Sequence, residues 1–430
     1  MQLPLTAATP WTFSEKLSLR FFLLLFVLYI FFNPNGVLPY IDIAFGLYIE
    51  PFHNLMIWIA GHVLKLSYPI TVFTNGSGDT TYDYVVVFFI TVISLVVSVV
   101  WTSGDRKPRS LNKLFYWLCV ILRFYVAMTM LTYGMVKVIK LQFPFPSPAR
   151  LVQSYGDSSP MGLAWTFMGY SKGYNYFTGF AELLGGILLF FRRTTTLGAL
   201  IALMVSVNIM AINYCFDVPV KLLSTTLVLM TSFLLAKDFK RLMNFFILNK
   251  TAPPANITPP KFKKRWQNTG LAVFKYLLIV YVLLLNITGV ISGSKQYGDD
   301  AKKPPFYGIY HVQNFIRNND TIAPLKTDST RWDNLIVSWK GGATIKMVND
   351  STRSFGFRPD SVTKSIVMFS NLDTTKKSTL TYSYPAKRFL LLAGKWNNDS
   401  LKVFLRKQDM QNFLLVDRGF HWINERPFNR

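Results

Sequence analysis

Cysteine is nearly absent from this sequence, and histidine is rare. Cys119 and Cys215 are the two cysteines in 430 residues, and no Cys-x-x-Cys pair occurs. Two isolated cysteines allow neither a disulfide framework nor a cysteine zinc site. Of the four histidines, only His311 and His421 follow Gly293, too few to indicate a metal site there. The sequence therefore predicts no metal ligands.

Acidic residues are also scarce: 22 Asp and Glu stand against 46 Lys and Arg, for a net charge of +24. Such an excess of positive charge can indicate nucleic acid binding. No helix-turn-helix, zinc-finger or RNA-binding motif is present, and the basic residues of the first 292 positions lie mainly between apolar runs. This pattern favours a lipid bilayer as the partner and excludes nucleic acid.

Apolar runs long enough to cross a bilayer, which takes roughly 20 residues in a helix, are absent after Gly293. Before it they recur. The sequence predicts a helical polytopic membrane bundle over residues 1–292, with about seven transmembrane helices near residues 17–32, 84–101, 115–140, 174–191, 195–214, 220–236 and 270–291. An eighth stretch, 51–66, is amphipathic and predicts an interfacial or re-entrant helix.

The Lys and Arg residues predict the orientation of these spans. With a cytoplasmic N-terminus, most basic residues fall on inner segments, as the positive-inside rule requires. They include Lys16, Arg20, Arg106, Lys107, Arg109, Lys113, Arg192, Arg193 and a basic loop at 237–265 with Lys261. An odd number of spans then places the C-terminus outside. We therefore expect a bacterial inner-membrane protein with a periplasmic C-terminal domain.

The C-terminal part has the pattern of an all-β domain. After a linker at 293–301, residues 302–430 carry short β-branched and aromatic runs at intervals of about 8–12 residues, separated by turn residues. This spacing predicts an antiparallel barrel or sandwich of seven to nine strands. An up-and-down barrel is the first choice.

Ionisable side chains inside the apolar spans are costly and indicate candidate functional residues. Arg123 and Lys137 share one helical face of the third span with Gly134, and Glu182 lies on a glycine-containing face of the fourth. We expect Glu182 to pair with Arg123 or Lys137, either as a helix lock or as part of a site facing a substrate or quinone. The candidate intramembrane polar site comprises Arg123, Tyr133, Lys137, Glu182 and Asn208.

The same residues carry a family resemblance. Residues 122–137, which begin with Leu-Arg and end with YGMVK, resemble the first helix of DoxX-type membrane proteins. Residues 179–186 (GFAELLGG) and 192–198 (RRTTTLG) are similar to the second helix and turn of that family. The resemblance covers the central four spans, about residues 115–240. A fainter likeness is to the vitamin K-dependent carboxylase group, which also joins a membrane bundle to an outer β domain. None of its catalytic residues is matched here.

The resemblance implies the membrane subunit of a quinone-linked oxidoreductase system, with possible protein subunits in the membrane or periplasm as partners. The bundle has no haem-ligand pair, and the chain has no flavin or nucleotide motif, so redox chemistry would need a bound organic carrier, such as the quinone that the resemblance implies, or a separate subunit. The sequence does not identify catalytic residues. The alternative is a non-catalytic membrane anchor or scaffold whose periplasmic β domain binds an envelope partner or small ligand. The sequence leaves both functions open.

Overall fold

A computed structural model describes residues 11–33, 42–72, 78–105, 110–254, 262–370, 374–426 and 428, with only the backbone for 42–48. The predicted inner-side residues Arg106, Lys107, Arg109 and Lys261 lie outside these ranges. The chain forms two compact units. One comprises Met1–Phe143 with Ser159–Asp299, and the other comprises Pro144–Ser158 with Asp300–Arg430.

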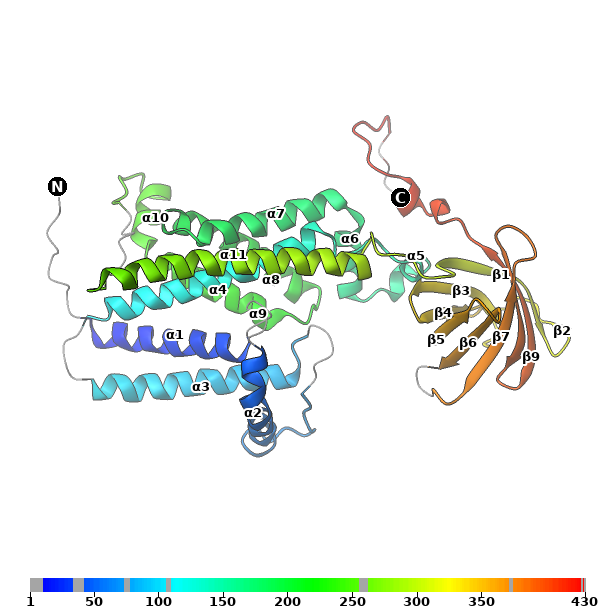
Figure 1. Cartoon of the computed structure of the whole chain (residues 1–430), viewed down its shortest axis with the longest axis horizontal. Coiled ribbons are helices and arrows are strands. Elements are labelled where there is room, and N and C mark those ends of the chain that lie inside the picture. Colours follow the sequence, from blue (N-terminus) through cyan, green and yellow to red (C-terminus); the bar gives the residue numbers. More distant parts are fainter. Residues whose placement is uncertain are drawn as a thin grey trace. The chain divides into compact units, whose positions relative to one another are not determined.

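The first unit is helical (Figure 1). Each predicted span coincides with one of its helices to within two residues at the ends that it overruns. The helix bounds are α1 Phe13–Phe32, α2 Asp42–His62, α3 Thr81–Gly104, α4 Asn112–Val138, α6 Pro160–Tyr170, α7 Lys172–Leu189, α8 Thr195–Cys215, α9 Lys221–Ala236, α10 Phe239–Phe246 and α11 Arg265–Gln296. Side-chain caps fix several starts. Thr12 and Glu15 form a capping box at α1, and Ser159 and Ser171 cap α6 and α7.

Some of these helices are long and apolar enough to cross a membrane. Four described segments qualify: α3, α4, Arg192–Cys215 (α8 with the turn before it) and α11. A fifth is added if α9 and α10, which meet at an 80° bend, form one broken span. Helix α1 begins with Glu15, Lys16 and Arg20, and these charges make it a weaker candidate. The expected number of about seven spans therefore stays a prediction.

Helix α2 begins before the amphipathic stretch expected at 51–66 and ends before its last residues. It begins at Asp42, contains Pro51 and ends at His62. Figure 1 shows α2 running across the direction of α1 and α3, whereas those two helices run side by side. Its C-terminal half contributes Met56, Ile59 and Ala60 to a small apolar cluster with α3.

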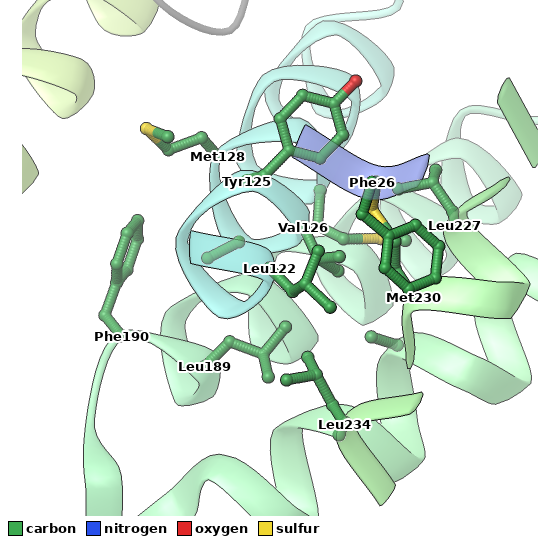
Figure 2. Close-up of a cluster of buried hydrophobic side chains, with 14 of the residues drawn as sticks. Phe26, Leu122, Tyr125, Val126, Met128, Leu189, Phe190, Leu227, Met230 and Leu234 are labelled. Carbon is green, nitrogen blue, oxygen red and sulfur yellow. The ribbon is translucent and has the colours of Figure 1, made fainter. Parts of the chain in front are cut away.

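Helix α4 is the centre of the helical unit. Of its most apolar stretch, 61% is buried, compared with 6% for α11. Figure 2 shows side chains of α4 among side chains from α1, α7 with the residue after it, and α9. The labelled residues are Leu122, Tyr125, Val126 and Met128 of α4, with Phe26, Leu189, Phe190, Leu227, Met230 and Leu234. A helix that is apolar on all sides is typical of a bundle centre. Polar groups on α4 are therefore placed among other helices.

The second unit contains a closed eight-stranded antiparallel barrel. Its strands follow the order β1, β3, β4, β5, β6, β7, β8, β9, and β9 pairs with β1 to close it. Their bounds are β1 Gly308–Arg317, β3 Trp332–Trp339, β4 Gly342–Met347, β5 Thr352–Asp360, β6 Ser365–Ser370, β7 Lys377–Ser383, β8 Phe389–Trp396 and β9 Asp399–Lys407, with the two-residue β2 Asp320–Thr321 beside β1. The predicted up-and-down barrel is confirmed, and the sandwich alternative is wrong.

Apolar side chains fill the barrel. Trp332, Phe315 and Phe357 are each at most 2% exposed and belong to one interior cluster with side chains from the other strands. An eight-stranded barrel is about wide enough for its own side chains to fill. The barrel is therefore a rigid body whose polar groups lie on its outside and at its ends.

A segment from between two helices belongs to the barrel unit. Helix α5, Pro148–Leu151, contacts β1 and β3, and the Ala149 N–H donates to Ser338 Oγ at 3.1 Å. Ile309 and Ile336 face each other on β1 and β3 and are 0% and 1% exposed, although neither belongs to the interior cluster. We infer that the α5 segment covers this outer apolar patch. The sequence boundary at 302 did not include it.

This cover predicts how a barrel fragment behaves. Residues 300–430 alone should give a β-type circular dichroism spectrum, because the interior cluster is complete in them. Exposure of Ile309 and Ile336 should lower the free energy of unfolding by roughly 2–4 kcal/mol relative to a fragment with residues 144–158 attached by a flexible linker. Urea unfolding of both fragments measures the difference. A helical spectrum, or equal stability, would contradict the account.

Candidate functional site

A buried ion pair joins α4 to α7. Lys137 Nζ lies 2.6 Å from Glu182 Oε1, and their side chains are 5% and 1% exposed. Lys137 stands in the last turn of α4, and Glu182 stands in the middle of α7. A buried carboxylate without a partner would carry a large desolvation cost. Of the two partners predicted for Glu182, the structure selects Lys137.

Glycines bring the two helices close enough for this pair. A methyl group at Gly134 would lie 2.9 Å from the Gly179 carbonyl oxygen, and one at Gly179 would lie 2.9 Å from that of Gly134. Further along, Gly186 faces the Ala127 carbonyl at the same close distance. Small residues permit such backbone approach between helices in membranes. The glycines on these two helical faces therefore lie at the contact between α4 and α7.

Tyr133 is the third residue of the site. It stands one helical turn before Lys137, and Lys137 Nζ lies 5.7 Å from the centre of the Tyr133 ring. An ammonium at this distance from an aromatic face is attracted to it. The ring of Tyr133 therefore lies beside the pair.

Arg123 lies elsewhere on α4. Its Nη1 donates to Thr195 Oγ1 at 3.3 Å, and its guanidinium lies 5.4 Å from the centre of the Phe124 ring. Fourteen residues separate it from Lys137, which is about 21 Å along a helix. One carboxylate cannot serve both cations at that separation. The expectation that Arg123 could pair with Glu182 is wrong, because the shared helical face extends too far along the axis.

Asn208 is not part of the arrangement either. It lies on α8 with an exposed side chain. The described site therefore contains Lys137, Glu182 and Tyr133 from the five predicted residues. The sequence places Asn208 in a predicted span but does not give the rotation of α8 about its axis. It could therefore not show that the Asn208 side chain faces away from the site.

A second buried ion pair was missed. Arg20 of α1 is 1% exposed, pairs with Asp105 after α3, and donates to Thr102 Oγ1 at 3.1 Å. Its guanidinium lies 4.7 Å from the centre of the Trp101 ring. The sequence showed the signal, an arginine within the first predicted span, but Arg20 was interpreted only as an orientation signal. The α1–α3 pair and the α4–α7 pair hold helices in the same way.

The loop before α3 caps the start of α9. Asp79, just before α3, accepts the Leu222 N–H at 2.8 Å through Oδ2, and its own N–H donates to the Pro219 carbonyl. Burial raises the pKa of the Asp79 carboxyl from its ordinary value. A carboxylate at the first turn of α9 accepts a hydrogen bond from an N–H group that has no partner within the helix, and its negative charge interacts favourably with the helix dipole.

The chemistry available at the Lys137–Glu182 site is narrow. Glu182 Oε2 is buried without a hydrogen-bond partner among the described residues. No group of three His, Cys, Asp or Glu side chains that could hold a metal ion occurs in the described ranges. The geometry can therefore lock two helices or hold a proton at the free carboxyl oxygen, and the described side chains around it include no redox group.

The two cysteines should not form a disulfide. Cys119 lies one turn before Arg123 on α4, and Arg123 contacts Thr195 at the start of α8. Cys215 ends α8, twenty residues or about 30 Å from Thr195, whereas a disulfide needs Cα atoms within about 7 Å. Oxidation of the purified chain, followed by mass spectrometry, should give no Cys119–Cys215 peptide. Finding that crosslinked peptide would refute the helix arrangement.

Comparisons with known proteins give a relative over part of the chain. No family profile matches the chain, and no solved structure matches it. The chain is similar to the uncharacterized protein YwoB of Bacillus subtilis (strain 168), with 41% identity over 144 residues, which cover 34% of this chain and 90% of YwoB. The likenesses to DoxX proteins and to the carboxylase group stay predictions. The chain belongs to the same family as YwoB.

Proposed function

We propose that this chain is a non-catalytic membrane anchor whose helical unit holds a β-barrel binding module at the membrane. The observation that carries the proposal is that charged side chains of the helical unit pair with each other. Lys137 with Glu182, and Arg20 with Asp105, each join two helices, and the four side chains are 1–12% exposed. Groups that are paired and enclosed in this way stabilise a bundle and are poorly placed to meet a substrate.

The barrel is the better candidate for recognition. Its closed strand order leaves no free edge along the barrel wall, and its interior is packed. Exposed polar and basic side chains cover its outer surface. A rigid scaffold with polar groups on its outside suits the binding of an envelope partner or a small ligand.

The basic residues support an orientation with the N-terminus in the cytoplasm. Among described residues, Arg192 and Arg193 are exposed in the turn between α7 and α8, and Lys237 and Lys240 are exposed around the α9–α10 bend. Basic residues at helix ends favour the cytoplasmic side. With about seven spans, the barrel would then be periplasmic, in a bacterial inner membrane.

Alkaline phosphatase fusions test this orientation. The enzyme fused after Arg430 should be active, because it folds only outside the cytoplasm, and a fusion after Arg109 should be inactive. Both fusions would be expressed at matched levels, verified by immunoblot. The reverse activity pattern would overturn the orientation and the periplasmic placement together.

A second function, the quinone-linked oxidoreductase subunit, is favoured by one observation. Glu182 Oε2 is unpartnered among the described residues, and a carboxyl oxygen of this kind could exchange a proton with a quinone. The DoxX likeness supports the same idea. On this reading, Lys137 and Tyr133 would face the carbonyl oxygens of the carrier.

Analysis of small molecules retained by the purified protein separates the two functions. The chain would be purified in mild detergent and its organic extract analysed by mass spectrometry, alongside the Glu182→Gln variant. The anchor function predicts no stoichiometric quinone in either sample. Stoichiometric quinone in the wild type that is lost in Glu182→Gln would establish the oxidoreductase reading instead.

A further inference from the structure

A polar recess lies on the barrel where β1, β3 and β9 adjoin. Its volume is about 410 Å³, within the range of small-molecule sites. His311 of β1 stands opposite Arg406 of β9 on one side and Asn334 of β3 on the other. Directly opposed residues of antiparallel strands point to the same face of the sheet. Strand register thus brings three polar side chains from three strands into one row.

The recess carries an excess of positive charge. Arg388, Arg406 and Lys407 line it, and Asp409 is the carboxylate in its lining. Arg388 Nη2 lies 3.2 Å from Asp409 Oδ2, with both side chains more than one third exposed, so this pair is weak. No carboxylate of the described residues forms an ion pair with Arg406 or Lys407. Lys407 stands opposite Tyr310, and its Nζ lies 5.7 Å from the centre of that ring, so its side chain lies on the other face of β9 from Arg406. Arg406 is therefore the cation of this lining that is available to a ligand.

The rest of the lining is neutral and polar. Gln313, Asn334 and Gln408 supply amide groups that both donate and accept hydrogen bonds. His311 adds a ring nitrogen, and its Nδ1 lies 3.6 Å from Asp333 Oδ1. A recess of this volume is larger than a single oxyanion needs. Its occupant must therefore have further polar atoms that match the amides.

We propose that this recess binds the phosphate group of a phosphorylated, hydroxyl-rich small molecule, such as a sugar phosphate or polyol phosphate. Arginine presents paired N–H groups that match phosphate oxygens, and Arg406 supplies the uncompensated charge. The amide side chains bind the hydroxyl groups of the same ligand. This inference deepens the proposed binding role of the barrel and rests on it.

The test measures binding to the full-length chain in mild detergent. Isothermal titration with a hexose phosphate should show saturable binding that weakens as salt is raised, because exposed charge pairs are screened. Arg406→Gln should weaken this binding by about tenfold to a hundredfold, the usual effect of a lost charge-assisted hydrogen bond. The unphosphorylated hexose should not bind measurably.

The matched control is Arg353→Gln. Arg353 is an exposed arginine of β5, which lies across the sheet order from β9. This variant should bind the hexose phosphate as the wild type does. Equal binding by Arg406→Gln and wild type would overturn the assignment of the recess.

Two further outcomes are informative. If a hydroxyl-rich carboxylate such as gluconate binds and the hexose phosphate does not, the phosphate class is wrong while the recess remains a binding site. If no phosphorylated probe binds, the inference fails. Neither outcome contradicts the anchor function, because a separate experiment tests it. That function is wrong if the wild type retains stoichiometric quinone and Glu182→Gln loses it.

Discussion

Replacement of Glu182 by glutamine should lower the free energy of unfolding by about 3–5 kcal/mol, the usual effect of removing one partner of a buried ion pair. Glutamine has nearly the same shape, so packing between α4 and α7 is kept. The Lys137 ammonium, 5% exposed, would then lose its charge partner in a low-dielectric surrounding. Unfolding of the detergent-solubilised chain by SDS, followed by tryptophan fluorescence, measures the change.

Asn208→Ala is the control for that variant. Asn208 was an equally plausible polar candidate in a neighbouring span, but its side chain is exposed on α8. A substitution away from buried contacts usually changes stability by no more than about 0.5 kcal/mol. Wild-type stability in Glu182→Gln, or a comparable loss in Asn208→Ala, would count against the assigned roles.

Replacement of Trp332 by alanine should destabilise the barrel by about 3–5 kcal/mol, as for other large-to-small changes in a packed core. Trp332 is 1% exposed, and its ring centre lies 5.0 Å from that of Trp396 and 6.0 Å from that of Phe315. Alanine would leave a cavity among these aromatic side chains. The near-ultraviolet circular dichroism signal should be lost at a lower temperature than in the wild type.

Trp422→Ala provides the matched comparison. Trp422 is 90% exposed, so its loss removes a tryptophan without opening a cavity. Its thermal midpoint should stay at the wild-type value. If both variants melt like the wild type, the barrel interior is not packed as the structure has it.

Much of the fold follows from local patterns. The apolar runs predicted the positions of the helices, and the short alternating runs after Gly293 predicted an antiparallel barrel. Both patterns act through near neighbours in sequence, at periods of 3.6 and 2 residues. The helix α10 was not predicted, because the basic loop at 237–265 was interpreted without its apolar positions, such as Phe239 and Phe246.

Features that depend on contacts between distant segments were not predictable in the same way. The α5 segment belongs to the barrel unit because of Ala149 and its neighbours on β3, about 190 residues further along. Arg388 and Arg406 adjoin through the β8–β9 pairing, whereas His311 reaches them only through the β1–β9 pairing that closes the barrel. The choice of Lys137 over Arg123 depended on the axial register of α7 against α4, which the glycine contacts determine.

The double variant Lys137→Met/Glu182→Met tests most directly whether the buried Lys137–Glu182 pair is a helix lock. Removing both charges leaves two apolar side chains of similar length, and buried ion pairs replaced in this way are often neutral or stabilising. The free energy of unfolding of the double variant should therefore be close to that of the wild type and above those of Lys137→Met and Glu182→Met. The double-mutant cycle should then give a coupling energy of several kcal/mol between the two contacting residues. A double variant no more stable than the less stable single variant would contradict the lock and the anchor function built on it.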